Sequence, residues 1–79
     1  MKQLEPYEQR MVVEYRELED KRQKLAAFLR AEAANNSNDS NVTALEYCYM
    51  QAQLDAMDMY STMLEQRMEL HGIEYKENQ

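Results

Sequence analysis

Two groups of side chains in this sequence could bind an anion. The first is a run of cations, Arg16, Lys21, Arg22 and Lys24, and the second is the pair Tyr60 and Arg67. An arginine can hold a phosphate through two parallel N–H groups, and a tyrosine ring can stack on a base. The ordinary interpretation is a solvated face whose cations pair with acids of the second half of the chain. The functional hypothesis is that these six residues form an anion or nucleotide pocket between subunits.

No pattern in the sequence indicates catalysis or a resident cofactor. There is no glycine-rich phosphate loop, and Cys48 and His71 are not spaced as a nucleophile and its base. Met68 stands three residues before His71, where a di-iron bundle would carry a glutamate. We expect no enzyme activity, no catalytic residue, no metal and no cofactor. We expect Cys48 to be a small buried side chain, and His71 to end a helix, where positive charge is favourable.

The composition is that of one small acidic domain over residues 1–79. Cys48 is the only cysteine among 79 residues, so an internal disulfide is excluded and oligomerisation is the expected reinforcement. Residues 1–34 are neutral, whereas residues 35–79 carry the whole net charge of −6. An acidic balance argues against direct nucleic-acid binding. No apolar run resembles a leader or a membrane span, so we expect an intracellular protein with no membrane partner.

Two long helices account for nearly all of the chain. Pro6 suits the first turn of a helix over residues 6–34, and the Asn/Ser-rich stretch 35–42 favours a loop. Thr43 and Glu46 form a capping box that begins a second helix over residues 44–71, and Gly72 suits the position after its end. Residues 72–79 are expected to form a polar tail, in which Ile73 is placed to fold back onto Met68 and residues 74–79 fray. The fold class is therefore all-α, an antiparallel two-helix hairpin.

The second helix has one apolar seam more than a hairpin can cover. A seam in the first helix, interrupted by a cation, contains Met11, Tyr15, Leu18, Arg22, Leu25 and Leu29. Its partner in the second helix contains Met50, Leu54, Met57, Ser61, Leu64, Met68 and His71. A second seam, offset by about one residue, includes Tyr49, Ala52, Ala56, Met59, Met63 and Leu70. We expect this second seam to form a homo-oligomer interface, a dimer or larger, that completes a helical bundle. Tyr60 and Arg67 would lie at the edge of that assembly, facing Arg22. The methionines fill the core or, alternatively, form an adaptable binding face.

Each helix carries a spaced set of residues that matches a known pattern. In the first helix these residues are Tyr15, Glu17, Leu18, Lys21, Lys24, Leu25, Phe28 and Leu29. In the second they are Gln53, Leu54, Ala56, Met57, Tyr60, Leu64 and Arg67. With these residues, both helices resemble short helical-hairpin accessory proteins of crAss-like and related phages of gut bacteria. The resemblance implies a viral accessory protein in the cytoplasm of the infected host, with no established activity.

These observations favour a non-enzymatic phage accessory protein that works by binding. We expect counter-defence, either by sequestering a nucleotide immune signal such as a cyclic nucleotide or by blocking a host defence protein. The acids Asp55, Asp58, Glu65 and Glu69 of the second helix would suit the protein-blocking version. The alternative is a purely structural, self-assembling oligomer or a virion-associated protein.

Overall fold

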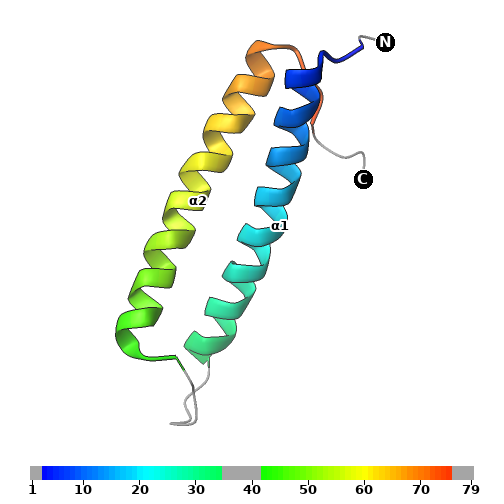
Figure 1. The fold of residues 1–79 in the computed structure, drawn as a ribbon. Coiled ribbons are helices and arrows are strands. Elements are labelled where there is room, and N and C mark those ends of the chain that lie inside the picture. The colour runs from blue at the N-terminus through cyan, green and yellow to red at the C-terminus, as the bar shows by residue number, and fades with distance from the viewer. Residues whose placement is uncertain (1–2, 35–41, 76–79) are drawn as a thin grey trace.

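The computed structural model describes residues 3–34 and 42–75 and contains two helices lying side by side and antiparallel (Figure 1). Helix α1 spans Pro6–Ala34, and helix α2 spans Ala44–Leu70. The expected all-α hairpin is confirmed. Most of the expected loop, residues 35–41, lies outside the described residues. Neither helix is long and apolar enough to cross a membrane, within the part of the chain that is described.

Local hydrogen bonds mark the ends of the helices. At the start of α1, the backbone N–H of Glu5 donates to Glu8 Oε1 at 2.9 Å, so the carboxylate covers an otherwise unpaired donor. At the start of α2, Thr43 accepts from the backbone N–H of Glu46 at 3.1 Å, as the capping box predicts. These bonds fix where each helix begins.

Helix α2 ends in a Schellman motif built on Gly72. The N–H of Ile73 donates to the carbonyl of Met68 at 2.9 Å, and that of Gly72 donates to Glu69 at 3.1 Å. Gly72 has φ +67°, a conformation that side chains with a Cβ disfavour. The motif reverses the chain and returns Ile73 toward the core, as expected from the sequence.

The main core lies toward the end of the hairpin where the chain starts and finishes. Leu64 and Met68 of α2 are fully buried there. They form one cluster with other buried residues, Met11, Val12, Leu18, Ile73 and Tyr75. Toward the other end, Leu25, Met50 and Leu54 are only half-buried. Leu29 is buried there as well, but the larger buried cluster lies at the end where α1 begins and α2 ends (Figure 1).

The expectation that the tail is frayed over residues 74–79 is wrong at Tyr75, which is buried. Ile73 and Tyr75 are 5 % and 8 % exposed. The Tyr75 ring packs edge-on against Tyr15 with centroids 5.2 Å apart, and its hydroxyl bonds Glu69 at 3.1 Å. The turn at Gly72 directs this segment back onto α1, which a polar composition does not reveal. Residues 76–79 lie outside the described part.

Candidate functional site

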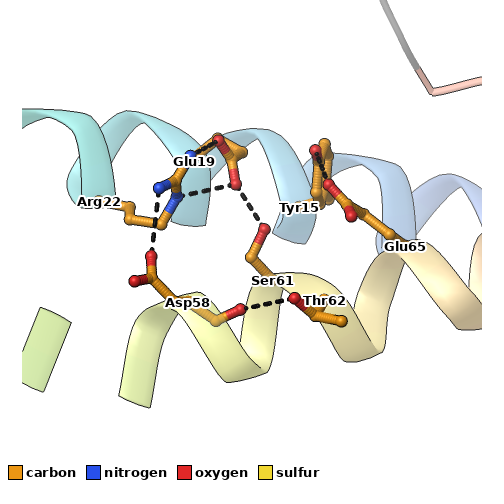
Figure 2. Close-up of polar contacts among 7 residues, drawn as sticks. All are labelled: Tyr15, Glu19, Arg22, Asp58, Ser61, Thr62 and Glu65. Carbon is orange, nitrogen blue, oxygen red and sulfur yellow. Dashed lines mark hydrogen bonds and ion pairs between the residues drawn. The ribbon is translucent and has the colours of Figure 1, made fainter. Parts of the chain in front are cut away.

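A polar crossing interrupts the apolar seam near the middle of the hairpin (Figure 2). The Arg22 guanidinium binds Glu19 through two contacts, Nε–Oε1 at 3.1 Å and Nη2–Oε2 at 2.7 Å. Its third contact, Nη1–Oδ1 at 3.1 Å, reaches Asp58 on α2. The Ser61 hydroxyl donates to the same Glu19 carboxylate from the α2 side. The crossing therefore links the two helices through one arginine and one serine.

The charges at this crossing stabilise one another. Arg22 holds the pKa of Glu19 below its usual value, since its hydrogen bond outweighs the opposing effect of burial and Ser61 adds a second bond. The hydrogen bond that Arg22 donates to Glu19 in turn raises the pKa of Arg22. Two turns before Arg22 on α1, the Tyr15 hydroxyl donates a hydrogen bond to Glu65 of α2 at 2.6 Å. Burial first, and then this bond to Glu65, raise the pKa of Tyr15.

A groove beside the crossing has a volume of about 300 Å³ and a polar lining: Glu19, Arg22, Asp58, Ser61, Thr62 and Glu65. It contains three carboxylates against one guanidinium, so its charge is negative when these groups are ionised. All three hydrogen bonds of the Arg22 side chain go to carboxylates, as in the interpretation of cations paired with acids. A phosphate would have to replace one of these partners to reach Arg22, so its binding there stays a prediction.

The basic residues of α1 do not gather in one place. Arg16, Lys21 and Lys24 are exposed, whereas Arg22 lies in the interface, 31 % exposed at its side chain. Lys24 pairs with Asp20 one turn away, at 2.9 Å on the surface. At about 100° per residue, Arg16 and Lys24 lie on the side of α1 that faces away from Arg22. One hairpin therefore offers no cluster of the four cations.

The outward face of α2 carries a long apolar strip, which we call the α2 strip: Leu45, Tyr49, Ala52, Ala56, Met59, Met63 and Leu70. Tyr49, Met59 and Leu70 are 65 %, 64 % and 87 % exposed. By contrast, Met57 is half-buried and Met68 is fully buried against α1. The methionines of α2 are thus divided between the core and the surface. The second seam expected from the sequence remains uncovered in the single hairpin.

Tyr60 and Arg67 border the α2 strip on one flank, two turns apart, and both are exposed. Within one hairpin neither residue faces Arg22, so the expected arrangement between subunits stays a prediction. Arg22 contacts Asp58, and two residues correspond to about 200° of rotation, so Tyr60 points to the other side of α2. Among the residues that the structure describes, no carboxylate pairs with the Arg67 side chain.

A match to a protein-family model covers the whole of both helices. The model of the Sequestin family matches residues 5–70. The chain belongs to the Sequestin family. The name of this family is compatible with a protein that binds or sequesters a partner. It gives no organism, so the expected phage origin stays a prediction. Neither a curated protein nor a solved structure matches the chain.

In this Sequestin family member, the family match ends beside a second polar contact that sequence reasoning missed. Glu8 is 2 % exposed, and its Oε2 lies 3.4 Å from Nδ1 of His71. The Tyr7 ring stands edge-on to the His71 ring, 5.5 Å between centroids. A heptad pattern does not reveal a contact between the start of α1 and the end of α2. The sequence signal for this contact was the position of Glu8: it stands three residues before the seam residue Met11, so an acid lies on the apolar face of α1.

The expectation that Cys48 is buried is wrong, because the structure places it on the surface of α2. Cys48 is two residues from Met50, which faces α1, so it points away from the core. Tyr47 nearby turns inward and its hydroxyl reaches the carbonyl of Leu29 at 3.4 Å. The aromatic neighbours of Cys48 therefore do not enclose it.

Proposed function

We propose that this Sequestin family member is a non-enzymatic binding protein that works as a homo-oligomer and sequesters a nucleotide-type ligand. The observation that carries the proposal is the uncovered α2 strip with Tyr60 and Arg67 on its flank. The strip supplies a surface for self-association, and the flanking pair supplies groups that recognise a phosphorylated aromatic ligand. The family name supports sequestration as the mode of action.

Self-association is supported by the exposure of the α2 strip. Leu45, Tyr49 and Met59 are each more than 60 % exposed, although they follow one another along a single face. Covering such a face with another hairpin removes apolar surface from water and forms a helical bundle with α2 at its centre. Ala52 and Ala56 permit a close approach of the second helix.

Ligand binding is supported by the position of Arg67. An arginine without a carboxylate partner can offer its fork of N–H groups to a phosphate. Tyr60, on the same flank, offers a ring on which a base can stack. Arg22, by comparison, would first have to exchange Asp58 for the ligand. Arg67 and Tyr60 are therefore the principal candidates, with Arg16 and Lys21 as exposed cations on α1.

The biological setting follows from the resemblance of both helices to phage accessory proteins. In that setting the protein acts in the cytoplasm of an infected bacterium, and the ligand is a nucleotide signal of host immunity. Binding without conversion would lower the concentration of free signal in proportion to the amount of protein.

The test combines light scattering with the recovery of bound small molecules. The protein is purified without denaturation, sized, then heated, and the released molecules are identified by mass spectrometry. Cyclic di-AMP serves as a defined probe in titration calorimetry. We expect an oligomer that binds the probe and returns it unchanged, with affinity reduced at least about tenfold in Arg67→Ala. The matched control is Arg30→Ala, an exposed arginine near the end of α1. Failure to retain any nucleotide, or to bind the probe at micromolar concentration, would remove the proposal.

A second candidate is the blocking of a host defence protein, because the α2 strip could also receive an apolar helix from another protein. The acidic side of α2 favours this candidate less. Asp58, Glu65 and Glu69 each bind a side chain of the hairpin itself. Co-purification of a stoichiometric host protein would favour blocking, whereas an oligomer without any ligand or partner would favour a structural role.

A further inference from the structure

Large and small residues are separated along the α2 strip. Its central part begins with Ala52 and Ala56 and continues with Met59 and Met63, all exposed in the single hairpin. A helix laid along this face therefore meets a hollow in one half and a ridge in the other. A second copy of the chain carries the same hollow and the same ridge.

We propose that two copies pair through their α2 strips in antiparallel orientation about a twofold axis. In this register Ala52 lies level with Met63 of the second copy, and Ala56 lies level with Met59 of the second copy. Each methionine then fills the space left by an alanine, as dense packing requires. Parallel pairing would instead set alanine against alanine and methionine against methionine, which leaves a void and a crowded layer along the same contact.

Charge complementarity supports the same register. An antiparallel twofold pair brings each flank of a helix against the same flank of its partner. Glu46, Tyr49 and Arg67 lie within about 60° of one another around α2. Arg67 of one copy is therefore level with Glu46 and Tyr49 of the second copy. The contact provides a carboxylate for the Arg67 guanidinium, which has none among the described residues of its own copy, and an aromatic ring beside it.

This inference rests on the self-association in the proposed function and adds to it. The site at Tyr60 and Arg67 becomes composite, because the second copy contributes Tyr49. The carboxylate of Glu46 from the second copy orients Arg67 by engaging part of its guanidinium, and the remaining N–H groups can hold a phosphate, whereas carboxylates engage all three nitrogens of Arg22 inside the hairpin. Each dimer would then contain two identical sites related by the twofold axis.

Cysteine cross-linking tests the orientation without requiring a ligand. In a Cys48→Ser background, Ala52→Cys and Met63→Cys are prepared separately, then oxidised alone or mixed, with copper phenanthroline as oxidant. Both positions are exposed, so neither change disturbs the hairpin core. In the antiparallel pair, residue 52 of one copy lies about 16 Å along the axis from residue 52 of the other. A disulfide requires Cα atoms within about 7 Å.

The expected result is a cross-linked dimer only in the mixture, with neither variant cross-linking to itself. Cross-linking of each variant alone would show a parallel pair and overturn the inference. Absence of a dimer in every sample would overturn it as well. Light scattering on the uncross-linked protein and calorimetry with cyclic di-AMP report on self-association and ligand binding separately. A dimer that binds the probe but cross-links in the parallel pattern would refute the orientation and leave the proposed function standing.

Discussion

The Ser61 hydroxyl of α2 donates to Oε1 of Glu19 on α1 at 2.5 Å, in the middle of the helix interface. The same carboxylate accepts two hydrogen bonds from Arg22. The half-buried, charged side chain of Glu19 is therefore hydrogen-bonded from both helices. A buried polar contact of this kind can specify one register between two helices, because a shifted register would leave a charge without partners.

The Glu19 contact predicts a loss of stability in acid. Since the pKa of Glu19 is lower in the folded chain than its unfolded value of about 4.3, its contribution is present above that pH and disappears as the pH falls through the folded pKa. Urea unfolding followed by circular dichroism between pH 7 and pH 2 will measure this effect. Glu19→Gln should show a flatter acid limb. The exposed neighbour Glu17→Gln is the control, and an equal effect in both variants would contradict this role for Glu19.

The end of the hairpin where α1 begins and α2 ends is predicted to contribute most of the stability. Leu64→Ala removes a fully buried side chain and should cost about 2–5 kcal/mol of unfolding free energy, or abolish folding. Leu45→Ala changes the same residue type at a site that is 62 % exposed and should change the hairpin by less than about 0.5 kcal/mol at dilute concentration. Chemical denaturation of both variants gives the comparison. Similar losses would show that the core is not concentrated around Leu64.

The turn after α2 is predicted to depend on the backbone of Gly72. A Cβ at this position would meet no atom within 4 Å, so any cost of Gly72→Ala comes from its φ of +67° alone. We expect a loss of about 1 kcal/mol, visible as a lower melting temperature. Gly72→Asn should lose less, because asparagine tolerates this conformation better. Equal melting temperatures for all three proteins would argue against a Schellman motif there.

The Tyr15–Glu65 contact predicts a loss of stability in alkali. Burial and the hydrogen bond raise the pKa of Tyr15, so the unfolded chain loses this proton first, near pH 10. Stability should therefore fall as the pH rises from about 10 toward the folded pKa. Tyr15→Phe should weaken this dependence, whereas Tyr49→Phe on the exposed strip should retain it. Denaturation at pH 9 and pH 11 measures the difference, and identical pH dependence in Tyr15→Phe and the wild type would contradict the prediction.

The helices and their facing seams could be predicted because their signals are local. Pro6, the Thr43–Glu46 capping box and Gly72 act within one or two turns, and the alternation of apolar residues is a property of one helix. The same periodicity separated Met57 and Met68, which lie on the core face of α2, from Met59 and Met63, which lie on its outer face.

Contacts between distant residues could not be predicted in this way. The pairing of Arg22 with Asp58, and of Glu8 with His71, depends on the register between α1 and α2, which periodicity leaves open. Tyr75 was missed because its burial depends on where the turn at Gly72 sends the chain. The exposure of Cys48 could have been read from its angle to Met50, but its tyrosine neighbours suggested an enclosed position.

The returning segment after α2 has a practical consequence for how the domain is delimited. Similarity to the family ends at residue 70, yet Ile73 and Tyr75 belong to the same buried cluster as Leu64 and Met68. A chain cut at residue 70 would retain both complete helices but lose Ile73 and Tyr75, which cover the end of the hairpin where α1 begins and α2 ends. The folding unit is therefore longer than the segment by which its family is recognised, and expression boundaries for this chain should extend past the glycine turn.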